Sequence, residues 1–220
     1  MTTATQFIET ARSLLGRNEA DGTHKYIIDV YNKCKPLPRG YKVKYTDPWC
    51  ATFVSAVAIL TGATDIIPRE CSCAKMIEGF KAIGCFVEDE NRIANVGDIV
   101  FYDWNDNGNG DNKGTPDHVG IVVTAGKYNM TVIEGNYNNK VQTRILAHNG
   151  RYIRGYGVPK YSNVASEPFE PVSKPSEKVD KGIDLIAKDV IAGKYGNGHV
   201  TRMTNIYNAV KKRVNELTKG

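Results

Sequence analysis

Apolar residues recur three and four positions apart through the first half of the chain, which is the spacing of amphipathic helices. After Gly97 the pattern changes to short apolar runs of strand type. The pattern predicts helices near residues 7–15, 27–34, 49–58 and 76–80, followed by strands at 98–102, 118–124, 130–134 and 152–158. Helices followed by strands predict an α+β domain in which the helices pack against an antiparallel sheet.

Residues 161–181 follow neither pattern. This segment holds Pro168, Pro171 and Pro175 among serines and charged residues, so it is predicted to be an extended linker. Helical spacing returns over 183–191 and 203–217. We therefore expect a domain at 1–160, a linker at 161–181 and a second domain at 182–220. About 40 residues is little for an independent core, so the second domain should be marginally stable or associate into a homo-oligomer.

Composition fits a folded protein, with 41% hydrophobic and 24% charged residues among 220. No apolar run approaches the length that spans a bilayer, and the first residues lack a basic segment followed by an apolar block. Synthesis in the cytoplasm without a signal peptide, and no membrane insertion, are expected. The five cysteines should then be free thiols. A zinc site on Cys34, Cys71, Cys73 and Cys85 is disfavoured because finger-type spacing is missing.

Positive charge is concentrated at the C-terminal end. Residues 181–220 hold 8 Lys/Arg against 3 Asp/Glu, which accounts for the whole net charge of +5. Such a basic region favours binding to a polyanionic surface. Nucleic acid is the competing partner, but no recognised nucleic-acid-binding motif is visible, so none is expected. A solvated basic helix face without a partner is the other alternative.

The segment 47–54 predicts a cysteine near the start of a helix. Asp47 is a good N-cap and Pro48 suits the first helical position, which would place Cys50 about one turn into the helix. The positive end of the helix dipole stabilises a thiolate there. Cys50 is therefore a candidate nucleophile that still requires a base.

Of the four histidines, His118 is the candidate base because it begins an apolar run of strand type after a loop rich in Gly, Asn and Asp. A strand end fixes the aim of a side chain and leaves it open to substrate. His24, His148 and His199 are predicted to be solvated loop residues.

An acid and an amide, Glu134 and Asn136, close the next strand two positions apart, which places them on one face of an extended chain. An imidazole base needs an acceptor on its other nitrogen to fix its tautomer and orientation. Glu134 is predicted to supply that acceptor, and Asn136 to orient or polarise from the same side. Ordinary turn residues at a strand end are the alternative.

The order of Cys50, His118 and the Glu-Gly-Asn segment 134–136 resembles the CHAP domain. That family of cysteine- and histidine-dependent amidohydrolases and peptidases is papain-like and close to NlpC/P60. The resemblance implies a helix carrying the thiol, packed on an antiparallel sheet. It also implies Cys50 as nucleophile, His118 as general base, Glu134 as the residue orienting it, and Asn136 as an auxiliary polar residue. The backbone N–H of Cys50 is expected to contribute to the oxyanion hole.

Residues 103–111 carry oxygen-bearing side chains in the pattern of an EF-hand-type calcium loop. Asp103, Asn105, Asn107 and Asp111 match its first, third, fifth and ninth positions, while Gly114 stands where a bidentate Glu is usual. Calcium binding by these four side chains is a hypothesis, and an Asn/Gly-rich hairpin loop is the alternative. The cysteine chemistry itself requires no cofactor.

Residues 186–198 and 209–217 resemble the CW_7 repeat, a small three-helix cell-wall-binding module that recognises the muropeptide of peptidoglycan. The resemblance implies ligand contacts near the glycine-rich segment, from Lys194, Tyr195, Gly196, Asn197, Gly198 and Arg202. Tyr195 departs from the family, where an indole is common, and the stretch before Ile206 is shorter.

The two resemblances imply a phage or prophage endolysin of a Gram-positive host, which acts on the cell wall after release from the cytoplasm. The expected reaction is hydrolysis of an amide bond of peptidoglycan, by an N-acetylmuramoyl-L-alanine amidase or an endopeptidase. Two alternatives stay open. A noncatalytic wall-binding protein would use Cys50 only as a small core residue, and a papain-like cysteine protease acting on proteins would share the catalytic set.

Overall fold

The computed structural model describes residues 2–89, 92–106, 113–148 and 150–162. They belong to the first of two units into which the chain divides, Met1–Val164 and Ala165–Gly220. Nearly all of the predicted linker, the predicted three-helix module at 182–220 and the candidate wall-binding residues lie outside the described residues. The domain boundaries therefore stay predictions.

The described residues form four α-helices and six strands, which confirms the predicted α+β class. Every predicted helix and strand of this region is present, with ends that differ by a few residues. The strands β1 and β5 and a short 3₁₀ helix are not predicted from the sequence. None of the helices in this part of the chain is long and apolar enough to cross a membrane. The elements are α1 (Ala4–Ser13), α2 (Lys25–Lys33), η1 (Pro38–Gly40), α3 (Cys50–Thr61), α4 (Cys73–Ala82), β1 (Phe86–Val87), β2 (Ile99–Tyr102), β3 (His118–Ala125), β4 (Asn129–Tyr137), β5 (Lys140–Ala147) and β6 (Ile153–Gly157).

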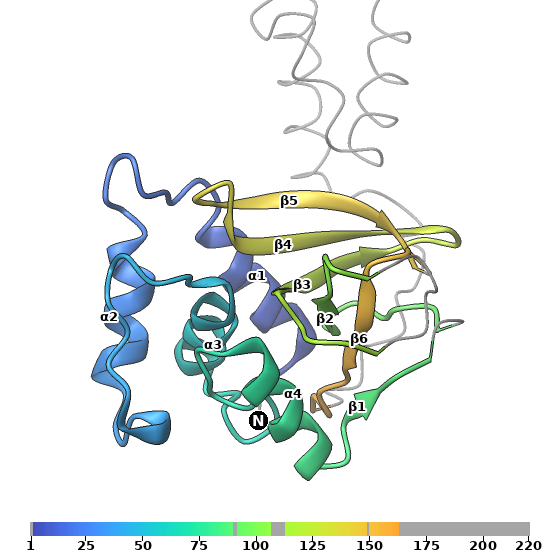
Figure 1. Ribbon diagram of the computed structural model, residues 1–220, viewed down its shortest axis with the longest axis horizontal. Coiled ribbons are helices and arrows are strands. Elements are labelled where there is room, and N and C mark those ends of the chain that lie inside the picture. Colours follow the sequence, from blue (N-terminus) through green and yellow to red (C-terminus); the bar gives the residue numbers. More distant parts are fainter. Residues whose placement is uncertain (1, 90–91, 107–112, 149, 163–220) are drawn as a thin grey trace, which may run out of the picture. The chain divides into compact units, whose positions relative to one another are not determined.

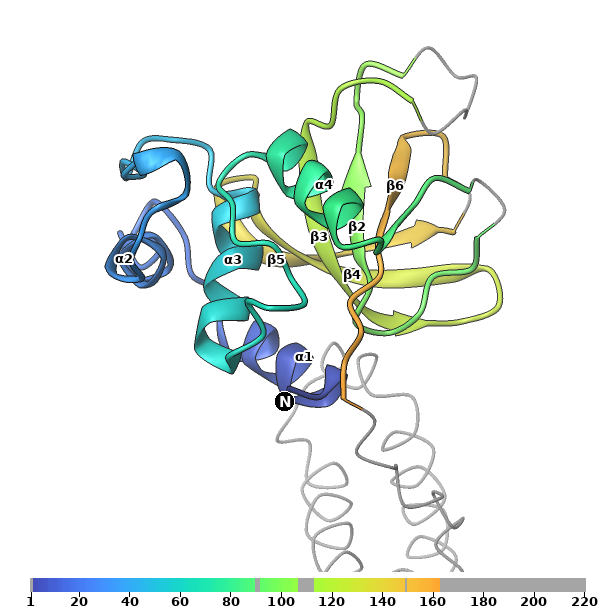
Figure 2. The same cartoon turned by 90° about the horizontal axis from the view of Figure 1, so that it is seen from below.

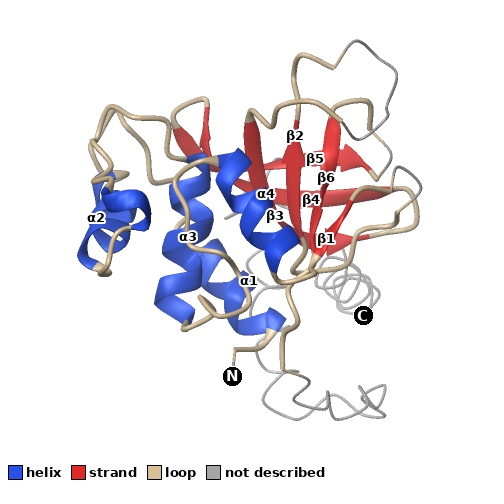
Figure 3. Cartoon of the chain, turned by 60° about the horizontal axis from the view of Figure 1, so that its bottom comes forward, coloured by secondary structure: helices blue, strands red, loops and turns tan. Residues whose placement is uncertain are grey.

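The strands form one antiparallel sheet in the order β1-β6-β2-β3-β4-β5 (Figure 1). The helices lie to one side of the strands (Figure 3). Helix α3 contacts both β3 and β4, and α1, α2 and α4 each contact α3 (Figure 2). The helix that begins with Cys50 is therefore packed directly on the two strands that carry His118 and Glu134.

Strand β2 shows how the sheet is buried on both faces. All four of its residues are buried. Ile99 and Phe101 join the large apolar cluster between helices and sheet, whereas Val100 and Tyr102 join a second cluster with Val132 and other residues of the opposite face. Alternate side chains of a strand point to opposite faces, so a continuous apolar run such as 99–102 is what a doubly covered strand requires.

Candidate active site

Cys50 is the first residue of α3, with Trp49 in the N-cap position. The prediction that Asp47 caps this helix is wrong. A carboxylate oxygen of Asp47 instead accepts hydrogen bonds from the Lys44 backbone N–H and the Tyr41 hydroxyl, both at 2.8 Å. The helix thus begins three residues after Asp47, and Cys50 lies at its first position rather than one turn inside. The thiol is still at the positive end of the helix dipole.

Close packing of α3 on β4 places Cys50 next to the sheet. Gly135 of β4 faces Phe53 of α3, and a Cβ added at Gly135 would lie 2.3 Å from the Phe53 Cβ and 3.1 Å from the Trp49 ring. Real carbon atoms do not approach so closely. A glycine at this position therefore lets the start of the helix approach the strand that carries Glu134.

The His118 ring meets the Glu134 carboxylate, with Nε2 of the histidine 3.2 Å from Oε2 of the acid. His118 is the first residue of β3, and Glu134 on β4 pairs with Gly120. A Cβ at Gly120 would lie 2.8 Å from the Glu134 Cγ, so this glycine gives the acid room to reach along the strand. Because Nε2 faces the acid, Nδ1 is the nitrogen left for Cys50. The predicted orienting contact is thus present in the structure.

The environment favours a thiolate and an imidazolium. The Cys73 thiol, hydrogen-bonded to Cys50, holds the pKa of Cys50 well below its usual range; burial opposes this effect and the neighbouring His118 supports it. Burial lowers the pKa of His118, but hydrogen bonds to Cys50 and Glu134 outweigh it and raise the pKa to about 9. Both shifts favour the thiolate–imidazolium ion pair, which is the reactive form of a cysteine nucleophile.

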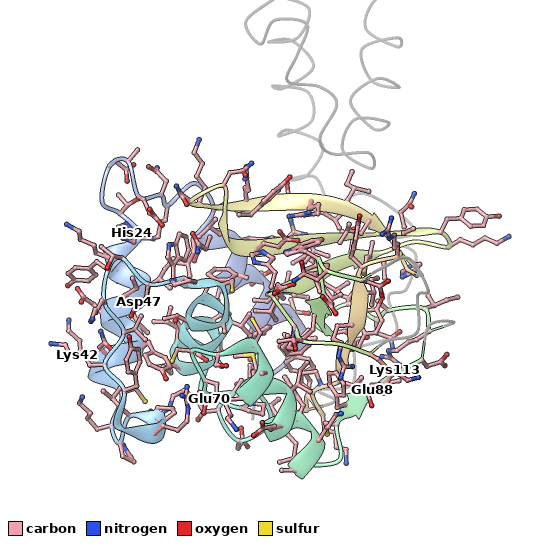
Figure 4. The ribbon with its side chains drawn as sticks, in the orientation of Figure 1. His24, Lys42, Asp47, Glu70, Glu88 and Lys113 are labelled. Atoms are coloured by element: carbon pink, nitrogen blue, oxygen red, sulfur yellow. The ribbon has the colours of Figure 1, made fainter. Side chains whose placement is uncertain are left out.

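A cavity of about 430 Å³ leads to the thiol. Figure 4 labels Asp47 in the loop before α3 and Glu70 in the loop before α4. Both loops contribute residues that line this cavity. Glu70 forms a 2.9 Å ion pair with Arg39, whose side chain is 46% exposed at the mouth. Charged and polar lining residues suit a polar substrate better than an apolar one. The lining includes Arg39, Tyr41, Asp47, Cys50, Cys73 and Asp117.

Two family models match this chain, the CHAP domain at residues 40–136 and the CW_7 repeat at residues 184–218. The chain carries an N-terminal CHAP domain and a C-terminal CW_7 repeat. No curated protein matches it. A CHAP domain implies hydrolase activity of the peptidoglycan amidase or endopeptidase kind, and the two families together support peptidoglycan as the substrate. The CHAP match ends at Asn136 and includes Cys50, His118 and Glu134.

Asn136 follows Glu134 by two positions in sequence but has an unusual backbone. Its φ is 58°, and the pairing of β4 with β5 shifts between Glu134 and Tyr137. The alternation that would place Glu134 and Asn136 on one face does not extend through this bulge. The Asn136 Oδ1 atom is buried without a hydrogen-bond partner among the described residues. Its auxiliary role stays a prediction.

Arg144 on β5 is a site residue that sequence analysis does not find. It donates hydrogen bonds from Nε (3.2 Å) and Nη2 (2.9 Å) to the same Glu134 oxygen that faces His118. Its guanidinium lies over the rings of Tyr137 (3.9 Å) and Trp104 (5.0 Å). The sequence signal that could have predicted the strand carrying Arg144 is the pair Asn138-Asn139. Both residues have positive φ, as the two-residue loop of a β-hairpin requires.

Two of the other histidines are buried, so the prediction that they are solvated is wrong. His24 is 4% exposed, and its Nε2 lies 3.1 Å from the Tyr45 carbonyl oxygen. His148 is 6% exposed; its Nδ1 accepts from the Ala94 N–H at 3.1 Å, and its Nε2 lies 2.8 Å from the Gly126 carbonyl oxygen. Both rings hydrogen-bond to backbone groups of neighbouring loops. His199 lies outside the described residues.

The candidate calcium loop is described only in part, because Asn107 and Asp111 lie outside the described residues. The Asp103 Oδ1 accepts from the Asn105 backbone N–H at 2.9 Å, which is an Asx turn. Within the described ranges, no three His, Cys, Asp or Glu side chains are grouped to hold a metal, and the five cysteines are free thiols. Calcium binding stays a prediction.

Proposed function

We propose that this chain is an endolysin that hydrolyses an amide bond of peptidoglycan with Cys50 as nucleophile. The observation that carries the proposal is the arrangement of Cys50, His118 and Glu134, with the thiol opening into a polar cavity. A buried cysteine that serves only the core has no need of a charged imidazole beside it. The alternative of a noncatalytic wall-binding protein is therefore disfavoured.

The proposed reaction proceeds through a thioester. The Cys50 thiolate attacks the amide carbonyl carbon, and the charge that develops on oxygen is stabilised by the Cys50 backbone N–H at the start of α3. His118 donates its proton to the departing amine as the carbon–nitrogen bond breaks. Neutral His118 then takes a proton from water, which attacks the thioester, releasing a carboxylate and restoring the thiolate. Glu134 holds the ring in place and stabilises its charged form.

Alanine variants test this mechanism. Cys50→Ala should abolish release of soluble fragments from purified walls, and His118→Ala should lower kcat/KM by about 10²–10⁴. The control is Cys85→Ala, because Cys85 lies away from the cavity with its thiol donating to the Ile83 carbonyl oxygen. Wild-type lytic rate in folded Cys50→Ala would overturn the cysteine mechanism.

The bond that is cut is tested by product analysis. An N-acetylmuramoyl-L-alanine amidase frees a lactyl carboxylate on the sugar and the amino group of L-alanine, whereas an endopeptidase frees an amino group within the stem or the cross-bridge. Mass spectrometry of digested sacculi separates these outcomes. Hydrolysis of unrelated protein substrates at a comparable rate would favour the papain-like protease alternative instead.

The endolysin assignment adds that the CW_7 repeat retains the enzyme on the wall of a Gram-positive host. A single basic module of about 40 residues should bind weakly, with added residence from oligomerisation or from the catalytic domain itself. Removing residues 176–220 should therefore leave hydrolysis of soluble fragments nearly intact and reduce activity on whole walls. A truncated protein that sediments with walls as well as the full chain would contradict the binding role.

A further inference from the structure

Two thiols meet at the active site. The Sγ atoms of Cys50 and Cys73 are 3.7 Å apart. Cys50 begins α3 and Cys73 begins α4, so each sulfur is fixed at the start of a helix. Both side chains are buried, at 6% and 8% exposure, yet both line the cavity that leads to the substrate. A small polar reagent that enters the cavity therefore reaches both sulfurs together.

We propose that Cys50 and Cys73 form a reversible disulfide when a hydroperoxide oxidises the nucleophile, so that Cys73 protects Cys50 from irreversible oxidation. The protective value rests on the proposed role of Cys50 as nucleophile, but the cross-link itself does not. A disulfide requires the sulfurs to approach from 3.7 Å to about 2.05 Å. Rotation of the two side chains about their Cα–Cβ bonds is the movement this requires.

The chemistry balances in two steps. The Cys50 thiolate attacks one oxygen of hydrogen peroxide and, with one proton, yields the Cys50 sulfenic acid and water. The Cys73 sulfur then attacks the sulfenic sulfur, the sulfur–oxygen bond breaks, and the Cys73 proton and the hydroxyl leave as a second water. Two equivalents of a small thiol reverse the process by exchange, forming the oxidised small-molecule disulfide and restoring both cysteines.

The local charges favour this sequence. Hydrogen bonding to the Cys50 thiolate is the main reason that the pKa of Cys73 lies well above its usual range, with burial and the nearby Asp117 adding to it. Cys73 therefore stays protonated while Cys50 is an active thiolate. Sulfenic acid formation removes the negative charge from Cys50, so Cys73 ionises more readily at the moment when its attack is required.

Cys71 is the competing resolving thiol, since it lines the same cavity two residues away. Its sulfur lies 3.5 Å from Nη2 of Arg39, which holds it at the mouth of the cavity. No hydrogen bond joins Cys71 to Cys50 among the described residues, unlike the pair of Cys50 and Cys73. Cys71→Ser is therefore the matched control, and it also simplifies mapping because trypsin leaves Cys71 and Cys73 in one peptide, residues 70–75, separate from Cys50 in residues 45–69.

The first measurement is the cross-link in the full-length protein. Full-length Cys71→Ser is treated with hydrogen peroxide, free thiols are blocked, and the tryptic digest is analysed by mass spectrometry with and without reduction. We expect peptide 45–69 joined to peptide 70–75, which in this variant assigns the bond to Cys50 and Cys73. Peptide 45–69 carrying sulfinic or sulfonic acid, with no joined species at any peroxide dose, would overturn the proposal.

The second measurement is recovery of activity. Each protein is inactivated with peroxide and then reduced with dithiothreitol, and its activity is compared with that of its own untreated sample. Wild type and Cys71→Ser should recover most of their activity, whereas Cys73→Ser should recover little because its oxidised Cys50 has lost the thiol that lies beside it. Equal recovery by Cys73→Ser and wild type would overturn the protective role. If wild type showed the cross-link without any loss of lysis, the proposed nucleophile would be wrong while the disulfide would stand.

Discussion

Arg144 donates two hydrogen bonds to the Oε2 atom of Glu134, from Nε at 3.2 Å and Nη2 at 2.9 Å. The same oxygen faces Nε2 of His118. One carboxylate oxygen therefore contacts both the guanidinium of Arg144, which is always charged, and the imidazole of His118, which titrates. Glu134 is fully buried, whereas the Arg144 side chain is 22% exposed. The arginine is a positioning residue, because it contacts the acid and not the reacting atoms.

Substitutions at Glu134 and Arg144 should move the alkaline limb of the pH profile of kcat/KM in opposite directions. Glu134→Gln keeps an acceptor for the ring but removes the charge that stabilises the imidazolium, so the limb should move to lower pH. Arg144→Met leaves the acid charge unbalanced beside His118, so the limb should move to higher pH. A merely structural arginine would lower activity without moving the limb.

Arg144→Met should also destabilise the domain by about 1–3 kcal/mol, because a buried acceptor loses charged donors. Urea unfolding followed by tryptophan fluorescence measures this, since both tryptophans of the chain, Trp49 and Trp104, lie in the described domain. Arg144→Lys is the control that keeps the charge and loses the two-pronged geometry, so its limb should stay near that of wild type. A lysine variant that shifts the limb as far as methionine would contradict the charge argument.

Residue type and local pattern were enough to select Cys50, His118 and Glu134, because Cys50 and His118 begin strongly patterned elements and Glu134 follows the apolar run within β4. The contact of Arg144 with Glu134 depends instead on the pairing register of β4 and β5. Arg144 pairs across the hairpin with Val132, and it reaches Glu134 diagonally, two residues along β4. Since no local pattern of β5 reveals that diagonal, the sequence alone does not identify the contact.

The wrong N-cap prediction and the missed approach of Cys73, both close to Cys50, have a similar cause. Asp47 has the composition of an N-cap, but Tyr41 and Lys44 engage its carboxylate before the helix begins. The approach of Cys73 to Cys50 depends on where two helices start in space, 23 residues apart in sequence. Local sequence rules carry no information on either point, since both are set by tertiary packing.

The close contact between Gly135 and Phe53 makes a prediction about stability. Gly135→Ala should destabilise the domain by about 1–3 kcal/mol, because the added Cβ, 2.3 Å from the Phe53 Cβ, forces α3 away from β4. The same displacement moves Cys50 relative to His118, so lysis should fall with it. Gly126→Ala is the control, since its Cβ meets only the Asn129 carbonyl oxygen at 3.3 Å. Urea unfolding that ranks the two variants equally would contradict the packing argument.

The calcium hypothesis is tested by thermal unfolding with chelator and with added calcium. If Asp103, Asn105, Asn107 and Asp111 bind the ion, chelator should lower the Tm, because a ligand bound only to the folded state stabilises it by about 2.7 kcal/mol at 100 times its Kd. Asp103→Ala with Asp111→Ala should remove that response. Asp103→Asn separates charge from local structure, because it keeps an acceptor for the Asn105 N–H. A Tm unchanged by chelator and by excess calcium would contradict the calcium hypothesis and favour an Asn/Gly-rich loop that binds no metal.

The Cys50–His118 pair predicts an activity loss at high pH that is not an unfolding event. With the pKa of His118 raised to about 9, the imidazolium that protonates the leaving amine is lost as pH rises through that value, so kcat/KM should fall. His118 alone would also make stability fall with pH from its usual pKa near 6.5 up to about 9, because the folded state holds the extra proton there.

The pH dependence that Cys50 gives to folding stability has the opposite sign. The folded pKa of Cys50 is depressed, so its contribution to stability is present above its unfolded pKa and is lost as pH falls through the folded value. As pH rises toward 9 the folded state keeps a proton on His118 while the unfolded state keeps one on Cys50, so the two slopes oppose each other. We therefore expect kcat/KM to fall near pH 9 while the Tm shows no matching step. Parallel measurement of both across this range decides the point, since a Tm that drops together with activity would assign the loss to unfolding rather than to titration of His118.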